Sequence, residues 1–401
     1  MDRFASERIR AFGTSVFTEM SRLAREHEAV NLGQGFPDFP GPDIVKDAAK
    51  AAIDADANQY APSHGTPRFR AAVAAEWSAR FGREVDPERE VTVTSGATEA
   101  VFDAIQAFVG PGDELIAFEP FYDSYLPSAV LAGATLRPVT LRPPDWRIDR
   151  DELRAAFGPR TRAILLNTPH NPTGKVFTRE ELEFVAALCQ EHDVVAITDE
   201  VYDRIVYPGF EHISLATLPG MWERTLAIYS TGKTFSMTGW KIGYLVGPAP
   251  LNAAVRAVHQ FVTFASGTPF QEAMATAIES AATDGYYGQL AADYDRRRMA
   301  LAAALEGAGL PILPIGGSYF LMADVSGLGF EDDAAFCRWL VVDAGVAAVP
   351  PSAFYADASR APMLARFCFA KRDETLALAA ERLWLLPDLL ASRAAAVSGR
   401  S

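Results

Sequence analysis

Hydrophobic positions in the middle of the chain fall into short β-branched runs, and stretches with helical periodicity separate these runs. The alternation is typical of a mostly parallel sheet that is covered by helices. Six of the runs are predicted to be strands, at residues 90–94, 114–118, 162–166, 194–198, 226–229 and 242–246. The pattern therefore predicts an α/β fold.

Helix signals lie between these strands, and the alternation breaks after about residue 285. Thr178 and Glu181 form a capping box ahead of an amphipathic run that ends near His192, so we predict a helix there. Beyond residue 285, a helical stretch rich in Ala and Arg leads to a segment at 316–324 and a strand-like run at 366–369. We predict that this part forms a second, smaller domain.

Composition limits the kinds of partner that the protein can have. The chain has 401 residues, of which 49% are hydrophobic, and this is enough for a buried core and for more than one domain. Its formal net charge of -14 works against nucleic acids and anionic membranes. An anionic ligand therefore has to be held by local groups.

The compartment is indicated by the first thirty residues and by the cysteines. The first thirty residues contain no unbroken apolar run of the secretory type, and no stretch of the chain approaches a membrane span. The chain has three cysteines, Cys189, Cys337 and Cys368. Their number is odd and their neighbours in the sequence are apolar, which fits reduced core residues better than disulfides. We therefore expect a cytoplasmic protein.

Lysine is rare in this chain, with six residues against 31 arginines, so each lysine invites a chemical reason. Lys233 and Lys241 lie close together in the segment 230–241, between two predicted strands, where a turn can present an amine to a pocket. An amine can form a Schiff base with a carbonyl group, and a guanidinium group cannot. An ordinary solvated loop lysine is the alternative for an isolated Gly-Lys-Thr sequence.

Two loops at the ends of predicted strands could bind polar ligands. The turn Thr94-Ser-Gly-Ala-Thr98 opens a helix and leaves free N–H groups that suit a phosphate, and a plain strand-to-helix turn is the alternative. The loop 167–174 contains two asparagines and two prolines, which suggests a pre-organised amide where a simple turn would need less.

Asp199 follows a nearly continuous apolar strand, which places a carboxylate at a buried edge of the sheet. A buried carboxylate needs a cationic partner, and a pyridinium nitrogen would be one. In return, Asp199 would keep that nitrogen protonated, which makes the ring an electron sink. A helix N-cap is the alternative role for an aspartate at such a position.

Six segments, in chain order, resemble the motifs of the fold type I aminotransferases of class I and II. The resemblance runs from about Asn31 to Arg372 and lies within the branch of kynurenine aminotransferase, glutamine transaminase K and bacterial methionine aminotransferase. It implies a large domain at 46–285, with a mostly parallel seven-stranded sheet, and a smaller α+β domain formed by 1–45 with 286–401. The segments are Asn31-Leu-Gly-Gln-Gly-Phe-Pro-Asp38, Asn58-Gln-Tyr60, 167–174, Asp199-Glu-Val-Tyr202, 230–241 and Arg366-Phe-Cys-Phe369.

The resemblance implies that the cofactor is pyridoxal 5'-phosphate, held by Lys233 as a Schiff base. Asp199 would pair with the pyridine nitrogen, while Asn171 and Tyr202 would hydrogen-bond the phenolic oxygen of the ring. Tyr122 would stack on the ring. The contacts to the phosphate would come from Ala97, Thr98, Ser230 and Lys241, and from Tyr60 of the partner subunit in a homodimer.

The substrate site follows from the same resemblance. Arg366 would bind the α-carboxylate as a bidentate fork, beside Asn171 and the backbone of Gly35. Phe17 would line the site. Phe17 and Thr98 stand where kynurenine-preferring relatives tend to have larger aromatic residues, which argues against a preference for kynurenine.

The implied reaction is a ping-pong transamination between an amino acid and a 2-oxo acid through pyridoxamine phosphate. Lys233, once displaced by the amino acid, would act as general base on the substrate Cα–H. The sequence points to no second arginine for a side-chain carboxylate, so we expect neutral, sulfur-containing or aromatic donors. The alternatives are an N-succinyldiaminopimelate aminotransferase and a cysteine-S-conjugate β-lyase. His64 is either part of the substrate entrance or a surface histidine.

Other cofactor and partner classes fit the sequence poorly. The thirty residues ahead of the family match are too few for the DNA-binding module of transcription regulators with a pyridoxal-phosphate fold. The segment 33–38 lacks the third glycine of the dinucleotide fingerprint, and Ala227 replaces the first glycine that a P-loop ending at Gly232 and Lys233 would need. The six histidines form no HExxH pattern, so no metal site is expected.

Overall fold

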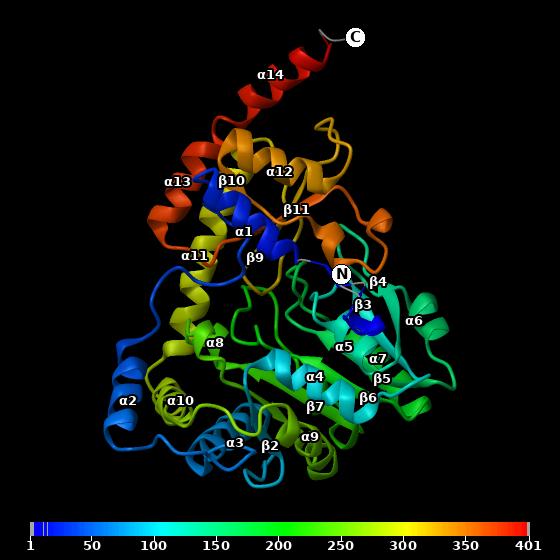
Figure 1. Cartoon of the computed structure of the whole chain (residues 1–401), viewed down its shortest axis with the longest axis vertical. Helices are drawn as coiled ribbons and strands as arrows, with labels where there is room; N and C mark the ends of the chain where they lie inside the picture. The colour runs from blue at the N-terminus through cyan, green and yellow to red at the C-terminus, as the bar shows by residue number, and fades with distance from the viewer. Residues whose placement is uncertain (1–3, 11, 14, 399–401) are drawn as a thin grey trace.

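A seven-stranded sheet forms the centre of the computed structural model, which describes residues 4–10, 12–13 and 15–398 (Figure 1). The strand order is β2-β8-β7-β6-β5-β3-β4. Neighbouring strands are parallel except at β8, which is antiparallel to both β2 and β7. The strands are β2 (Val91–Thr94), β3 (Glu114–Glu119), β4 (Thr135–Thr140), β5 (Thr161–Asn167), β6 (Val195–Asp199), β7 (Thr225–Ser230) and β8 (Gly243–Val246).

Both faces of this sheet are buried, which explains why its strands are nearly continuous apolar runs. In β7, Leu226 and Ile228 point into one apolar core, whereas Ala227 and Tyr229 point into another on the opposite face. The first face is covered by α4 (Ala97–Phe108), α5 (Tyr125–Leu131) and α9 (Ala249–Val262). The second is covered by α3 (Pro67–Phe81), α6 (Arg150–Ala156), α7 (Arg179–Glu191) and α10 (Thr268–Ala281), and α2 (Asp43–Asp54) packs on α10.

The six strands expected from the sequence are confirmed, each to within one residue at either end. The pattern does not predict β4, because it lies at the edge of the sheet, where the half-buried Arg137 and Pro138 interrupt the apolar run. The capping box is also confirmed. Thr178 Oγ1 accepts from the Glu181 N–H at 3.2 Å, and the Glu181 carboxylate accepts from the Thr178 N–H at 3.0 Å.

A second group of elements lies above the sheet in Figure 1 and is built from both ends of the chain. It contains two small sheets, in which β1 (Val30–Asn31) pairs with β10 (Val346–Ala347) and β9 (Phe320–Asp324) pairs with β11 (Leu364–Cys368). The division of the chain into 46–285 and 1–45 with 286–401 stays a prediction. The helices packed around the core of this group are α1 (Val16–Glu26), α11 (Tyr286–Gly307), α12 (Asp333–Ala344), α13 (Asp373–Leu383) and the start of α14 (Leu386–Ser398).

The helices and the cysteines bear on the expected environment of the chain. In the described part of the chain, no helix is both long enough and apolar enough to cross a membrane. Cys189, Cys337 and Cys368 are buried and unpaired, as the sequence predicts.

We predict that Leu226→Ala lowers the free energy of unfolding by roughly 2–5 kcal/mol, because the side chain is fully buried in the centre of the sheet and its removal leaves a cavity. Leu378→Ala is the matched control, since Leu378 on α13 is 43% exposed, and we expect a change below about 0.5 kcal/mol. Urea unfolding followed by tryptophan fluorescence measures both. Equal losses in the two variants would contradict this account of the core.

Candidate active site

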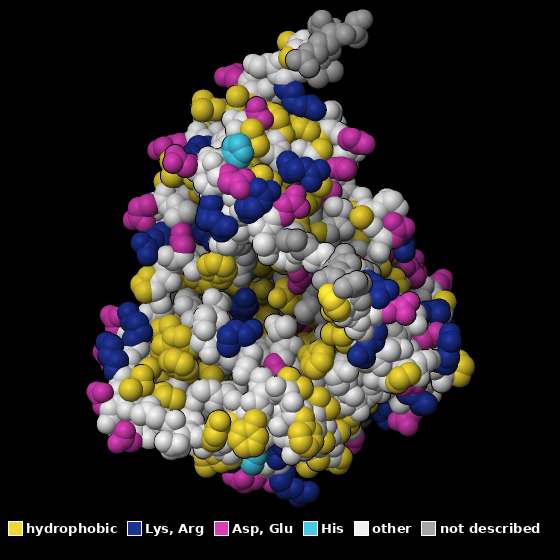
Figure 2. Space-filling view, in the orientation of Figure 1, with side chains coloured by type: hydrophobic (Ala, Val, Ile, Leu, Met, Phe, Trp, Pro, Cys, Tyr) yellow, Lys and Arg dark blue, Asp and Glu magenta, His cyan; other side chains and the backbone are white. Residues whose placement is uncertain are grey.

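A cavity of about 550 Å³ opens at the carboxyl ends of three parallel strands. Asn167, Asp199 and Ser230 end β5, β6 and β7, and all three line the cavity. The carboxyl edge of an open α/β sheet is where ligands bind in this class of fold. Figure 2 shows the molecule hollowed between the sheet and the elements above it, with basic side chains inside the hollow.

Twelve of the thirteen residues that the resemblance assigns to the cofactor or the substrate lie around this one cavity, although they come from distant parts of the chain. The exception is Tyr60, which is 85% exposed and makes an edge contact with the ring of Phe264 at 5.2 Å. His64 is also outside the cavity lining, and its Nε2 lies 3.7 Å from Glu88. The twelve are Phe17, Gly35, Ala97, Thr98, Tyr122, Asn171, Asp199, Tyr202, Ser230, Lys233, Lys241 and Arg366.

Lys233 presents a half-buried amine to the cavity. It lies in the short helix α8 (Thr231–Thr234) that follows β7 directly. Its Nζ is 3.5 Å from the carbonyl oxygen of Gly35 and 5.9 Å from the ring of Tyr202. Burial lowers the pKa of this amine to about 8. A fraction of the Lys233 side chains is therefore unprotonated near neutral pH, as a nucleophile or base requires.

Asp199 is a buried carboxylate with few partners. Tyr125 Oη donates to its Oδ2 at 2.6 Å, and the Val201 N–H donates to its Oδ1 at 3.4 Å. Burial raises the pKa of this carboxyl group to about 6. Among the described residues, no cation lies within ion-pair distance of Asp199. The carboxylate therefore lacks the cationic partner that a buried charge needs.

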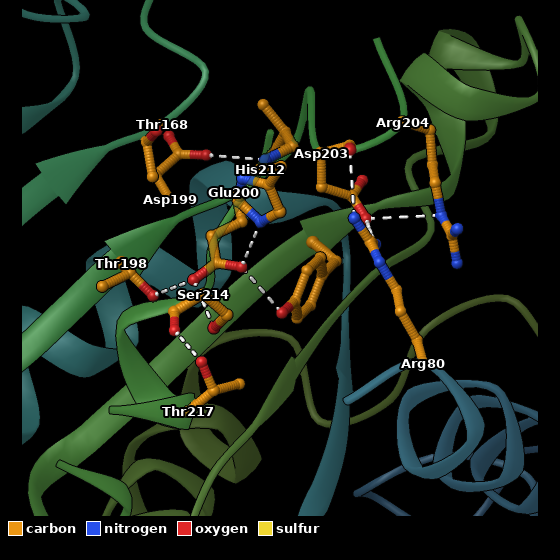
Figure 3. A network of polar contacts seen from close by, with 12 residues as sticks. Arg80, Thr168, Thr198, Asp199, Glu200, Asp203, Arg204, His212, Ser214 and Thr217 are labelled. Carbon is orange, nitrogen blue, oxygen red and sulfur yellow. Dashed lines mark hydrogen bonds and ion pairs between the residues drawn. The ribbon is translucent and has the colours of Figure 1, made fainter. Parts of the chain in front are cut away.

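Glu200, the next residue, is fully buried but fully partnered (Figure 3). The hydroxyl groups of Thr198, Ser214 and Tyr229 each donate to it at 2.8 Å, and Nε2 of His212 lies 2.9 Å away. Burial works to raise the pKa of Glu200, but the charge and hydrogen bond of His212 and the hydroxyl donors hold it below its usual value. This network fixes the end of β6 and therefore the position of Asp199.

The start of α4 forms an anion cradle with Lys241. Gly96 is the N-cap of this helix and provides no side chain to bond the free N–H groups of the first turn. Its φ of 83° favours glycine, and a Cβ there would lie 3.0 Å from Nζ of Lys241. Ala97, Thr98 and Ser230 line the same end of the cavity. Free N–H groups and an amine at a helix N-terminus suit a phosphate.

A buried polar cluster supports this turn from behind. Glu99 accepts from the backbone N–H of Ser95 and lies 2.9 Å from Nδ1 of His259, whose Nε2 is 2.7 Å from the carbonyl oxygen of Ser63. Glu99, Asp103 and His259 are close enough to hold a metal ion. Burial disfavours the charged imidazole, but the nearby carboxylates of Asp103 and Glu99 outweigh this effect and raise the pKa of His259 to about 10. The raised pKa favours a protonated His259 between the two carboxylates.

Arg366 is completely buried on β11 and faces the cavity without an acidic partner among the described residues. One NH2 group of its guanidinium donates to Asn171 Oδ1 at 2.8 Å, and the other donates to the carbonyl oxygen of Gly33 at 2.9 Å. Its Nε has no hydrogen-bond partner. The rings of Phe320, Phe17 and Phe354 surround it at 4.1, 5.1 and 5.1 Å. The guanidinium is therefore preset for a small anionic ligand.

Several residues of the site are not predicted from the sequence. Tyr125 follows Tyr122 by three residues in the sequence, and this spacing is the signal that could have suggested a second tyrosine in the site. Tyr319 Oη donates to the Gly35 carbonyl oxygen at 2.8 Å. A Cβ at position 35 would lie only 3.0 Å from the ring of Phe320, so this close approach favours glycine there. Arg25 lines the outer part of the cavity, and no sequence pattern marks it.

The residues present fit pyridoxal phosphate, the cofactor that the sequence resemblance implies. The cradle at Gly96 and Lys241 suits its phosphate, and Asp199 needs a cation such as a protonated ring nitrogen. Lys233 offers an amine with a lowered pKa to its aldehyde. Arg366 is left for a substrate carboxylate. The donor set therefore matches the cofactor at each of its reactive ends.

Comparison with known proteins gives consistent results. The family model "Aminotransferase class I and II" matches residues 27–383. Methionine aminotransferase of Escherichia coli is 43% identical over 371 residues, which cover 92% of this chain and 95% of that protein. Kynurenine–oxoglutarate transaminase 1 of Homo sapiens is 43% identical over 92% of this chain and 94% of its own. The structure of N-succinyldiaminopimelate aminotransferase from Mycobacterium tuberculosis superposes with a TM-score of 0.91, at 45% identity, over 95% of this chain and 100% of that one.

We predict that Gly96→Ala weakens binding of pyridoxal phosphate at least tenfold, because the new Cβ meets Lys241 and the backbone φ is strained. Gly82→Ala is the matched control, since Gly82 also has a positive φ but no atom lies within 4 Å of a Cβ there. We expect Gly82→Ala to lose stability without a change in cofactor affinity. Titration of the cofactor-free protein, followed by absorbance, measures the affinity. Equal affinities for wild type and Gly96→Ala would refute the cradle.

Proposed function

Since the chain belongs to the class I and II aminotransferase family and is a pyridoxal-phosphate-dependent transaminase, we propose that its amino donors are neutral, sulfur-containing or aromatic amino acids. The observation that carries this proposal is the surrounding of Arg366. Its guanidinium would hold the α-carboxylate, and the rings of Phe17, Phe320 and Phe354 beside it would favour apolar or aromatic side chains.

The residues of the cavity would hold the cofactor as follows. When bound, pyridoxal phosphate supplies an aldehyde carbon that reacts with amines and a pyridinium ring that takes up electron density from the substrate. Asp199 would pair with the ring nitrogen, and Asn171 and Tyr202 would bond the phenolic oxygen. Tyr122 would pack on the ring. The phosphate would lie among Ala97, Thr98, Ser230 and Lys241, all of which line one end of the cavity.

Lys233 would move the proton. Because burial holds its pKa near 8, an unprotonated fraction of Nζ can accept the proton of the substrate α-carbon. The same amine can then return the proton on the cofactor side, and the second half-reaction with a 2-oxo acid reverses these steps. Gly35 and Tyr319 would keep Nζ in place, since the Gly35 carbonyl oxygen lies 3.5 Å from it and is itself held by the Tyr319 hydroxyl.

A second candidate donor is an acidic amino acid of the N-succinyldiaminopimelate type. The observation that favours it is Arg25, a cation in the outer lining of the cavity. The relative from Mycobacterium tuberculosis that carries this name is 44% identical to this chain.

We also propose that the enzyme is a cytoplasmic homodimer. Tyr60, Phe261 and Phe264 are 85%, 86% and 49% exposed, and Tyr60 contacts Phe264, so together they offer an apolar surface of the kind that a second copy would cover. In a homodimer, Tyr60 would reach the phosphate site of the partner subunit. The three buried free cysteines suit a reducing compartment.

The donor proposal is tested by the first half-reaction. The loaded enzyme is mixed with single amino acids, and the loss of cofactor absorbance is recorded. We expect methionine and phenylalanine to react at least tenfold faster than aspartate, because the rings around Arg366 favour apolar side chains. Lys233→Ala should give no transamination. Equal rates for aspartate and methionine would contradict the donor class, and substantial turnover by Lys233→Ala would contradict the role of this lysine.

The homodimer is tested by Phe261→Asp, which places a charge on the exposed apolar surface. We expect this variant to shift towards monomer in light scattering after size exclusion, and to lose affinity for pyridoxal phosphate because Tyr60 no longer reaches it. Met299→Asp is the control, since Met299 is 53% exposed on a different helix, α11. An unchanged dimer mass for Phe261→Asp would speak against this surface as the interface.

A further inference from the structure

One face of α1 forms the outer wall of the cavity. Phe17 and Thr18 lie at the start of this helix, and Ser21 and Arg25 follow at helical spacing, so that Thr18, Ser21 and Arg25 share one face. All four line the cavity. This wall is therefore aromatic at Phe17, polar at Thr18 and Ser21, and cationic at Arg25.

Arg25 is the one basic side chain in the described lining of the cavity to which the proposed function gives no role. Four basic side chains line the cavity in the described chain: Arg25, Lys233, Lys241 and Arg366. Lys233 provides the amine, Lys241 belongs to the anion cradle, and Arg366 faces the substrate carboxylate. Arg25 is left without a role in binding the cofactor or the common part of an amino acid.

The neighbouring charges leave Arg25 unpaired. Arg22, one turn earlier on the same helix, forms an ion pair with Glu26, with distances of 2.7 and 2.6 Å to its two oxygens. Glu26, which follows Arg25 directly in the sequence, is therefore already paired. Within the described residues, the Arg25 side chain makes no ion pair or hydrogen bond. In a chain with a net charge of -14, an unpaired guanidinium at the mouth of a cavity is a local site for an anion.

The position of Arg25 sets the length of the ligand that it can bind. Phe17 lies beside Arg366, with 5.1 Å between its ring and the guanidinium carbon. Arg25 follows eight residues later, which corresponds to about 12 Å along a helix. A carboxylate on a short side chain, such as that of aspartate, would stay close to Arg366. A carboxylate at the far end of a long side chain would extend along α1 towards Arg25.

We propose that Arg25 is a specificity residue that binds the distal carboxylate of a long acidic amino acid, or of the corresponding 2-oxo acid, while Arg366 holds the α-carboxylate. This inference rests on the proposed function, because it places the substrate by its α-carboxylate at Arg366. It adds a second anion site to the same cavity. The enzyme then accepts short donors by their apolar side chains and long donors by a terminal charge.

The test is a series of α-amino acids with a terminal carboxylate, from aspartate and glutamate to 2-aminoadipate, 2-aminopimelate and 2-aminosuberate. The apolar counterparts norleucine and 2-aminooctanoate serve as neutral substrates of similar length. We expect kcat/KM of the donor half-reaction to rise with the length of the acidic series. Arg25→Gln should lower kcat/KM about tenfold for the longest acids and change kcat/KM less than twofold for the neutral donors.

Two controls separate charge from packing. Arg22→Gln removes a paired arginine from the same helix and should leave kcat/KM unchanged across the whole series. Arg25→Glu should lower kcat/KM for the long acids further than Arg25→Gln does. Added salt should slow the long acids in wild type and not in Arg25→Gln, because an exposed ion pair is screened. A flat length series, or an equal loss for acidic and neutral donors in Arg25→Gln, would overturn the inference and leave the proposed function standing. Failure of methionine to react with wild type would overturn the proposed function, and the inference with it.

Discussion

Two adjacent carboxylates buried at the end of β6 determine how the rest of the site is built. Burying an ionised carboxylate is costly unless hydrogen bonds or a cation compensate for the lost water. Glu200 receives three hydroxyl donors and the imidazole of His212, so it stays ionised. Asp199 has one hydroxyl donor and a long backbone contact, and its pKa rises to about 6. The unequal partnering leaves a single carboxylate that faces the cavity and lacks a cation.

The partners of these carboxylates tie the site to the fold. Tyr229 comes from β7 and accepts in turn from the indole N–H of Trp77 on α3, while Tyr125 comes from α5 on the opposite face of the sheet. The position of Asp199 thus depends on helices from both layers. Arg366 depends on the other part of the molecule, because it lies on β11 and the rings around it come from α1, β9 and the turn that ends at Phe354. The cavity exists only where these two groups of elements meet.

The sequence predicts the position of a site residue well when that residue stands at the end of a strand. Asn167, Asp199 and Ser230 end parallel strands, so their gathering follows from topology, and the apolar runs that precede them are visible in the sequence. β4 escapes prediction because an edge strand tolerates Arg137 and Pro138. Arg25 escapes because helical periodicity identifies a face but does not say that the face borders a cavity. Tyr60 lies outside the cavity of its own chain, so only an assembly could give it the role that the resemblance implies.

Asn171 connects the two halves of the site through its side chain and its backbone. Its side-chain oxygen Oδ1 accepts from Arg366 at 2.8 Å, while its backbone N–H donates to Oδ1 of Asn167 at 2.7 Å. A ligand that draws the guanidinium towards itself competes with this amide oxygen and alters the group that borders the ring site. With Arg366 on the substrate carboxylate and Asn171 on the ring, as proposed, occupancy of one site would be thermodynamically linked to the state of the other. Simple amines, which carry no carboxylate, would leave this linkage unused.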